Sequence, residues 1–344
     1  MNLPDRFRDE EHLEEVMSQP SPALVERMKS LDGDLIVLGI GGKMGVTLGR
    51  QAVRAIREAG VKKKVIGVSR FSDESARKKL EAVGLETISC DLLDRAAVSD
   101  LPRCANVLYM AGRKFGTSGD SALTWAMNTL VPSNVAEHFT KSRIVVFSTG
   151  NVYPLTPVVS GGATEATPVA PVGEYAQSAL GREKIFSYHA ARHGTPLAIF
   201  RLNYAIDMRY GVLYEIGKQV WNEQPVDVTM GHANVIWQGD ANTQALLALG
   251  HCETPPNILN VTGPETLSVR WAAQNLGRLL GKEAKIVGRE AENALLSNSA
   301  KATKLLGYPR VSLLTMLEWT ADWIRSGGRD IGKPSHFEVR DGKF

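Results

Sequence analysis

A glycine-rich segment between a buried strand and a helix constrains the fold of this chain most strongly. The apolar run 35–38 predicts a buried strand, and residues 46–59 predict a helix. Glycines between such elements allow a tight turn and a close approach to a pyrophosphate, whose charge the helix N-terminus attracts. An ordinary strand-to-helix turn also uses glycine, so the prediction of a dinucleotide site depends on this context. The predicted cofactor-binding residues are Gly39, Gly42, Lys43, Met44 and Gly45.

The order of elements predicts an α/β fold of the Rossmann type, a doubly wound parallel sheet with a smaller C-terminal lobe. Strands and helices alternate from residue 34 onward, which is typical of parallel sheets. The predicted strands cover 35–40, 65–69, 86–89, 106–110, 143–148 and 196–201. The predicted helices cover 45–59, 73–83, 94–99, 120–139, 174–193, 241–251, 268–280 and 312–325.

The chain is expected to have three parts. Residues 1–30 form a helical extension, and residues 31–202 form the NAD(P)-binding domain. Residues 203–344 mainly form a substrate-binding lobe, because irregular segments of this kind usually cover the carboxyl ends of the sheet strands. Segments near 235–260 are expected to return to the dinucleotide-binding domain.

Composition excludes several functional classes. A net charge of +3 over 344 residues argues against nucleic acid or an acidic membrane as a partner. No apolar run reaches membrane-spanning length, and the N-terminus lacks a secretion-signal pattern, so a cytoplasmic location is expected. Three scattered cysteines and a lone pair, His189 and His193, form no complete ligand set, so no metal site is predicted.

The end of the second predicted strand bears on the choice of nicotinamide cofactor. A site selective for NAD usually has an acid there, whereas arginine accommodates the 2′-phosphate of NADP. This strand ends with Ser69 and Arg70, which can hydrogen-bond and pair with a phosphate. The sequence therefore predicts NADP, with NAD as the second possibility.

Further motifs follow in chain order. Asp91 and Leu92 come after the third strand, and Ala111 and Gly112 after the fourth. The segment Ser148-Thr149-Gly150-Asn151-Val152-Tyr153 follows the fifth strand, and Tyr175 begins the next helix. Placed in this order on a Rossmann-type unit, the motifs resemble the extended short-chain dehydrogenase/reductase family of nucleotide-sugar epimerases, dehydratases and related reductases. The resemblance covers roughly residues 34–326.

The resemblance implies roles for these residues. Thr149 would be the catalytic hydroxyl and Tyr175 the proton carrier, which also contacts the cofactor. The adenine would contact Asp91 and Leu92, and the nicotinamide ribose would lie beside Ala111 and Gly112. The candidates for substrate binding are Arg113, Lys114, Asn151 and Asn203. The pocket is also expected to be lined by Asp207, Arg209 and His232.

One position departs from the family pattern. The family has a lysine four residues after the tyrosine, where its charge lowers the pKa of the phenol and its amine holds the ribose. This chain has Ala179 there. Two interpretations remain open: another cation replaces the lysine, or the chain is a noncatalytic NADP-binding sensor or scaffold. The candidate cations are Arg182, Lys184, Arg113, Lys114 and Lys43.

The expected function is that of an NAD(P)-dependent oxidoreductase or epimerase. Its substrate would be a small molecule with a hydroxyl or carbonyl group, namely a sugar, a sugar acid or a nucleotide sugar. The resemblance also implies a homodimer formed through the helices at 120–139 and 174–193.

Overall fold

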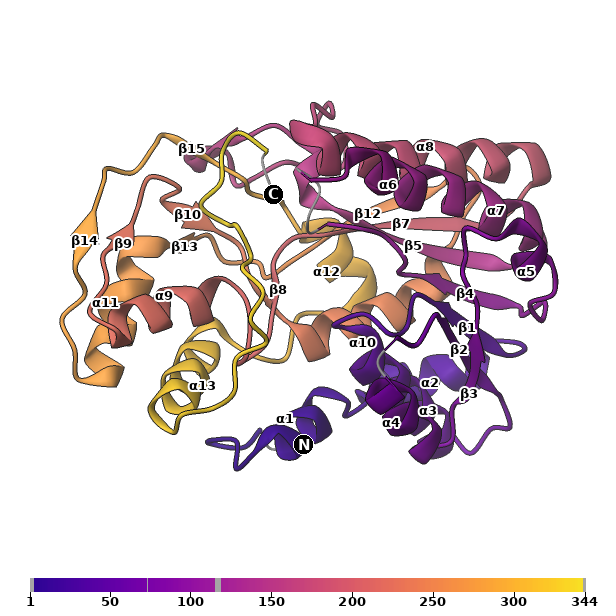
Figure 1. Ribbon diagram of the computed structural model, residues 1–344, viewed down its shortest axis with the longest axis horizontal. Coiled ribbons are helices and arrows are strands. Elements are labelled where there is room, and N and C mark those ends of the chain that lie inside the picture. The colour runs from indigo at the N-terminus through magenta and orange to yellow at the C-terminus, as the bar shows by residue number, and fades with distance from the viewer. Residues whose placement is uncertain (1–2, 73, 115–118, 343–344) are drawn as a thin grey trace.

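A seven-stranded parallel sheet forms the centre of the computed structural model, which describes residues 3–72, 74–114 and 119–342 (Figure 1). Its strand order is β12-β7-β5-β4-β1-β2-β3. Because the chain first extends the sheet from β1 to one side and then returns to add β4 on the other, ligands are expected at the crevice between these two strands. The strands are β1 Leu35–Leu38, β2 Val65–Ser69, β3 Glu86–Ser89, β4 Asn106–Tyr109, β5 Arg143–Thr149, β7 Leu197–Leu202 and β12 Asn257–Val261.

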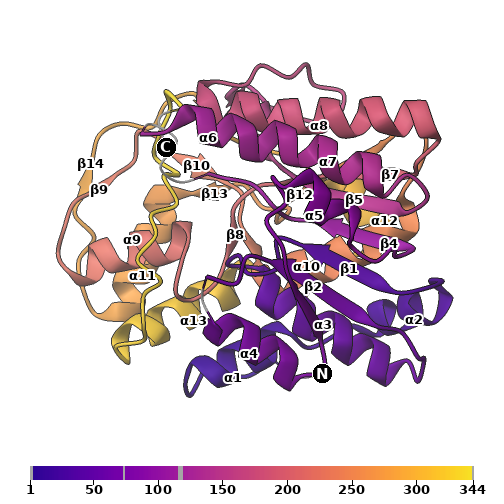
Figure 2. The ribbon, with the colours of Figure 1, turned by 45° about the vertical axis from the view of Figure 1, so that its right-hand side comes forward.

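Helices cover both faces of this sheet, which confirms the predicted doubly wound α/β fold (Figure 2). The alternation along β1 shows the two faces: Leu35 and Val37 belong to the core beneath α2, α3 and α10, whereas Ile36 and Leu38 belong to the core beneath α7 and α8. Strands buried on both faces are expected to be continuously apolar. These helices are α2 Pro22–Ser30, α3 Gly45–Glu58, α7 Val131–His138, α8 Gly173–His193 and α10 Gln238–Leu247.

Of the remaining helices around the sheet, α4 and α5 follow the predicted positions closely, whereas α12 was not predicted from the sequence. The helix predicted over 120–139 is interrupted by a π-helical turn, Ala126–Leu130, between α6 and α7. The first residue of the helix predicted over 73–83 lies outside the described residues. The elements are α4 Glu74–Ala82, α5 Arg95–Ser99, α6 Ser121–Trp125, α12 Ala300–Leu306 and the short 3-10 helices Gly150–Val152, Val158–Ser160 and Ala248–His251.

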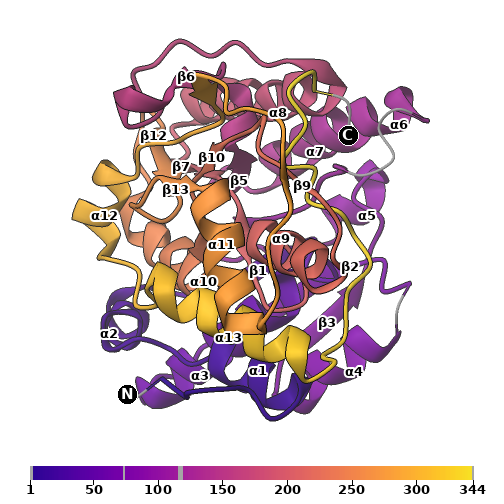
Figure 3. The ribbon, with the colours of Figure 1, turned by 90° about the vertical axis from the view of Figure 1, so that its left-hand side faces the viewer.

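A second hydrophobic core lies in a smaller lobe beyond the carboxyl ends of the strands (Figure 3). Its helices are α9 Val212–Trp221, α11 Val269–Leu280 and α13 Leu313–Arg325. Four short strand pairs complete it: β6 Thr156–Pro157 with β15 Asn293–Ala294, β8 Ala205–Ile206 with β11 Ile236–Trp237, β9 Val226–Asp227 with β14 Ile286–Val287, and β10 His232–Ala233 with β13 Leu267–Ser268. No helix among the described residues is long and apolar enough to cross a membrane.

The N-terminal helices join the two cores. Leu24 and Met28 of α2 pack in the core with α3, whereas Leu13 and Met17 of α1 Glu10–Met17 pack in the core of the smaller lobe. Glu14 of α1 is buried and forms ion pairs with Arg209, Arg50 and Lys79. These contacts tie the N-terminal segment to both parts of the structure.

A buried ion pair fixes α8 against the sheet. Arg201 of β7 donates two hydrogen bonds, of 2.9 and 2.6 Å, to the carboxylate of Glu183 on α8. Ser148 of β5 donates a third hydrogen bond to the same carboxylate. Both ionic side chains are about 5% exposed or less, so each needs the other to offset its loss of hydration.

We predict that Arg201→Met destabilises the protein by about 3–5 kcal/mol, because it leaves the Glu183 carboxylate buried without a countercharge. The double variant Arg201→Met/Glu183→Leu should recover much of this loss, since it removes both charges. Urea unfolding measures the free energies of unfolding. Arg95→Met, which breaks an exposed pair with Glu137, serves as a control and should have little effect. A single Arg201 variant as stable as the parent would contradict the prediction.

Candidate active site

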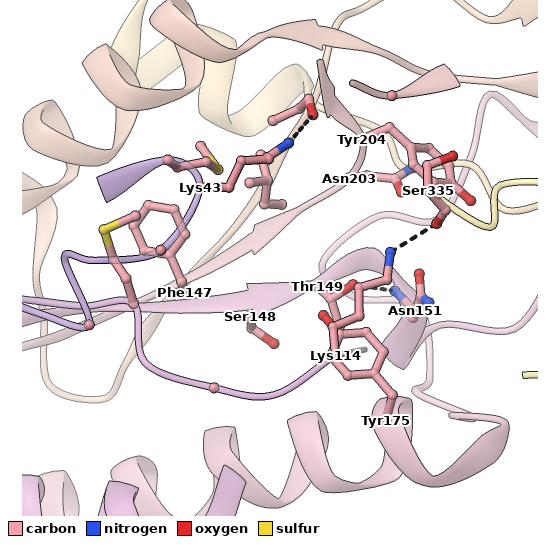
Figure 4. A pocket seen from close by; sticks show the side chains of 18 of the residues that line it. Lys43, Lys114, Phe147, Ser148, Thr149, Asn151, Tyr175, Asn203, Tyr204 and Ser335 are labelled. Atoms are coloured by element: carbon pink, nitrogen blue, oxygen red, sulfur yellow. Dashed lines mark hydrogen bonds between the residues drawn. The ribbon is translucent and has the colours of Figure 1, made fainter. Parts of the chain in front are cut away.

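A pocket of about 380 Å³ lies at the carboxyl ends of β1, β4, β5 and β7, beside the crevice expected from the strand order (Figure 4). Segments far apart in the sequence line it: the glycine loop, the loop after β4, the end of β5, the start of α8, residues 202–206 and the C-terminal segment. Both the seven-stranded sheet and the smaller lobe therefore contribute to one cavity.

The glycine loop fits the phosphates of a dinucleotide. Gly39 has φ +89°, and a Cβ there would lie only 2.6 Å from the backbone nitrogen of Ala111. A Cβ on Gly45 would clash with the carbonyl of Ile40, so both positions require glycine. Helix α3 begins at Gly45, and its N-cap Met44 makes no side-chain capping hydrogen bond. The N–H of Gly45 donates a hydrogen bond to the carbonyl of Gly42, so an anion would be bound by the N–H groups that follow it in the first turn of α3.

Thr149 and Tyr175 meet across the pocket. Thr149 is the last residue of β5, and Tyr175 is the third residue of α8. Both side chains line the pocket. Burial raises the pKa of the Tyr175 phenol, while the positive charge of Arg182 and the nearby Thr149 hydroxyl act to lower it. The arrangement can pass a proton to or from a ligand oxygen in this pocket.

Two lysine side chains reach into the same space (Figure 4). The Nζ of Lys43 lies 3.4 Å from the ring centre of Tyr210 and 3.5 Å from the carbonyl oxygen of Ala205. Burial lowers the pKa of Lys43 to about 7. The Nζ of Lys114 donates a 3.1 Å hydrogen bond to the carbonyl of Ser335, and burial lowers its pKa to about 8. Both ammonium groups would gain from a nearby negative charge.

The lining of the pocket is strongly positive. Arg113, Arg182 and Lys333 line it together with Lys43 and Lys114, and the described lining residues include no aspartate or glutamate. Such a surface favours a ligand that carries phosphate or carboxylate groups.

The C-terminal strap, residues 329–342, runs from the end of α13 past β8 (Figure 1) and reaches the pocket. Ser335 donates hydrogen bonds of 2.5 and 2.7 Å, from its backbone nitrogen and its hydroxyl, to the Glu215 carboxylate on α9. Lys333 and Ser335 both line the pocket. Sequence analysis missed these two residues and also Tyr204 and Tyr210, because no motif marks them and their proximity is created only by the fold.

The structure gathers most of the predicted site residues in this pocket. Asp207, Arg209 and His232 do not line it; Arg209 instead pairs with Asp207, Glu10 and Glu14. The predicted residues that line the pocket are Gly39, Gly42, Lys43, Met44, Gly45, Gly112, Arg113, Lys114, Thr149, Asn151, Tyr175 and Asn203.

The other predicted cofactor residues lie outside the pocket lining, at or beyond strand ends. Ser69 ends β2 against the glycine loop, where a Cβ on Gly41 would lie 2.6 Å from its hydroxyl, and Arg70 follows as an exposed residue. Asp91 follows β3 and accepts a hydrogen bond from the backbone of Leu93, whereas Asp94 caps α5. Leu92 is buried, and the backbone of Ala111 supports Gly39.

Comparison with known proteins agrees with this geometry. Residues 35–205 match the model of the NAD dependent epimerase/dehydratase family. No curated protein matches the sequence significantly.

Solved structures with the same fold include nucleotide-sugar enzymes. UDP-glucuronic acid 4-epimerase from Bacillus cereus, in complex with NAD, matches with a TM-score of 0.69 and 19% identity, over 85% of this chain and 99% of that one. MoeE5 in complex with UDP-glucose and NAD matches with a TM-score of 0.68 and 19% identity, over 86% of this chain and 99% of that one. UDP-glucose 4-epimerase from Thermotoga maritima, with UDP-glucose, matches with a TM-score of 0.67 and 18% identity, over 86% of this chain and 99% of that one. At these identities the likeness establishes the fold.

We predict that Lys43→Met changes how stability depends on pH. The pKa of Lys43 is lowered on folding, so the unfolded chain binds more protons between about pH 7 and 10.5. The free energy of unfolding of the parent therefore gains a contribution that grows with pH across this interval, and Lys43→Met should lack it. Denaturant unfolding at several pH values measures the difference between the two proteins.

The matched control is Lys62→Met, because Lys62 is an exposed surface residue. Its free energy of unfolding should follow the parent at every pH. Parallel curves for the parent and Lys43→Met would show that Lys43 keeps its ordinary pKa in the folded protein.

Proposed function

We propose that this chain, which belongs to the NAD dependent epimerase/dehydratase family through residues 35–205, is an NAD(P)-dependent enzyme that acts on a nucleotide sugar. The observation that carries the proposal is that Thr149 and Tyr175 line the same pocket as the glycine loop. A proton carrier and a dinucleotide cradle in the same cavity are the parts that hydride transfer at a sugar carbon requires.

The residues divide the chemistry between them. A nicotinamide dinucleotide held by the glycine loop would supply the hydride acceptor and donor. Tyr175 takes the proton from the reacting sugar hydroxyl and returns it when the carbonyl is reduced. Thr149, which lines the pocket with Tyr175, orients that oxygen through its own hydroxyl. In epimerisation the carbonyl is reduced from its opposite face, so there is no net oxidation of the sugar.

The charge of the pocket supports a nucleotide sugar as the substrate. Its diphosphate carries negative charge that Arg113 and Lys114 can pair with, and Asn151 and Asn203 can hydrogen-bond the sugar hydroxyls. The structurally similar proteins were solved with UDP-glucose or UDP-glucuronic acid. We assign the smaller lobe to substrate binding, because its residues 204–211 and the C-terminal strap close one side of the pocket.

NADP is the proposed cofactor, although the similar structures hold NAD. The support comes from Ser69 and Arg70 at the end of β2, a position that lacks the acid typical of NAD sites. Arg70 is exposed beside the glycine loop and can reach a 2′-phosphate.

A noncatalytic sensor or scaffold is the less favoured function. Such a protein would need the cofactor cradle but not a proton carrier, yet Thr149 and Tyr175 both line the pocket. Proton NMR of purified protein with NAD⁺ or NADP⁺ and a panel of UDP-sugars tests the choice. New anomeric signals would establish epimerisation, and absorbance at 340 nm would reveal net redox chemistry. No conversion of any UDP-sugar by cofactor-loaded protein would overturn the proposal.

We also propose a cytoplasmic homodimer. Large apolar side chains remain exposed on α6, the π-helical turn and α8, where the predicted dimer helices lie. Light scattering of the purified protein tests the mass. The exposed residues of this face are Leu123, Trp125, Leu130 and Tyr188.

We predict that Tyr175→Phe lowers kcat by about 10²–10⁴-fold, because general acid–base catalysis of this kind contributes that much. The affinity for the cofactor should change little, since the glycine loop is untouched. Turnover assays and cofactor titrations measure the two effects. Tyr188→Phe, an exposed position on the same helix, is the matched control. Full activity of the Tyr175 variant would exclude this residue as the proton carrier.

We predict that Arg70→Ala weakens binding of NADPH about tenfold and leaves binding of NADH nearly unchanged. The reason is that a charge-assisted contact with the 2′-phosphate contributes about 1.5–3 kcal/mol, and about 1.4 kcal/mol corresponds to a tenfold change in Kd. Fluorescence titration at fixed ionic strength measures both affinities, with Arg95→Ala as the control for loss of a surface charge. An equal effect on both cofactors, or parent protein that prefers NADH, would refute the assignment.

A further inference from the structure

The helix position where the family carries its lysine is occupied by a buried alanine in this protein. Ala179 is fully buried and packs with Val152, Tyr153 and Ala163 in a small apolar cluster. It does not line the pocket. The residue at this position therefore brings no charge to the pocket.

Arg182 reaches the pocket from the same face of α8. It stands seven residues after Tyr175, which is two helical turns, and both residues line the pocket. The Arg182 side chain is buried, and its guanidinium donates hydrogen bonds to the carbonyl of Phe147, at 2.8 Å, and to Oδ1 of Asn128, at 2.5 Å. A Cβ on Gly112 would clash with this guanidinium, so the glycine makes room for it.

The charge of Arg182 has no carboxylate partner within 4 Å among the described residues. The neighbouring acid in sequence, Glu183, is paired with Arg201 instead. The two hydrogen-bond acceptors of Arg182 are neutral, and its buried Nε has no hydrogen-bond partner. A buried positive charge with neutral partners acts strongly on nearby ionisable groups, because little water or countercharge screens it.

We propose that Arg182 is the positioning residue that supplies, from two turns further along α8, the positive charge that acts on the Tyr175 hydroxyl and that Ala179 cannot supply. The inference rests on the proposed function, in which Tyr175 carries the proton. In this interpretation the positive charge that the family carries at position 179 is carried at position 182 instead. Gly112 leaves space for the guanidinium, and Asn128 holds it through a hydrogen bond.

Other charged and titratable groups also surround the phenol. Lys114, on the loop after β4, places its Nζ 5.9 Å from the ring centre of Tyr175 and donates a hydrogen bond to Ser335 of the C-terminal strap. Tyr210, from the smaller lobe, interacts electrostatically with Tyr175, and the Thr149 hydroxyl lies in the same pocket. Burial raises the pKa of Tyr175, and the charge of Arg182 acts against this effect, whereas Lys114 approaches the ring.

The test is a pH titration of Tyr175 by NMR, with protein labelled at tyrosine ¹³Cζ and without substrate or cofactor. The Tyr175→Phe variant identifies the signal. In Arg182→Gln, which removes the charge but keeps a donor for Phe147, the pKa of Tyr175 should rise by about one unit or more. Arg182→Lys, which keeps the charge, should restore most of the shift. Arg192→Met, at an exposed position near the end of α8, should leave the pKa unchanged.

Because this readout needs no turnover, it is separate from the search for a substrate. An unchanged pKa in folded Arg182→Gln would overturn the inference even if the enzyme proves active, as would a larger effect of Lys114→Met. If Arg182→Gln does not fold, Gly112→Ala provides the second test, since its new Cβ displaces the guanidinium without changing any charge. The pKa of Tyr175 should then shift, and an unchanged value would count against Arg182.

Discussion

The ion pair between Glu183 and Arg201 is the contact on which the geometry of the site depends. It joins α8 to β7, and Ser148 extends it to β5, so the helix that carries Tyr175 is fixed against the strand that carries Thr149. Two adjacent residues of α8 therefore lie in different surroundings. The Glu183 charge is neutralised within the core, whereas the Arg182 side chain lines the pocket. One buried pair both orients the helix and leaves a neighbouring cation uncompensated.

The close approach of the glycine loop to β4 is the second constraint. Gly39 packs against the backbone of Ala111, and the next residue, Gly112, packs against the Arg182 guanidinium. Small residues at these two points bring the cofactor loop, the loop after β4 and α8 together around one cavity. A side chain at either point would separate elements that a hydride and a proton transfer need side by side.

The sequence predicted the sheet and most of the pocket because both follow local rules. Alternating strands and helices specify a parallel sheet, and parallel strands bring their carboxyl ends to one edge, so Thr149 and the glycine loop had to meet. Helix periodicity predicted that Arg182 lies on the same helix face as Tyr175. It could not predict the position of the guanidinium, which is fixed by hydrogen bonds to Phe147 and Asn128. Lys333 and Ser335 were unpredictable, because only tertiary packing carries the strap to the pocket.

The distribution of charge explains why the pocket suits an anionic ligand. Just outside it, Arg209 is neutralised by Asp207 and by Glu10 and Glu14 of the N-terminal helix. Inside it, Lys43 and Lys114 have carbonyl acceptors, and burial has lowered their pKa values toward neutrality. A diphosphate that entered would favour their protonated forms, so binding would draw protons onto the lysines. The acids of the N-terminal helix therefore neutralise Arg209 just outside the cavity, whereas the cations inside the cavity are left for an anionic ligand.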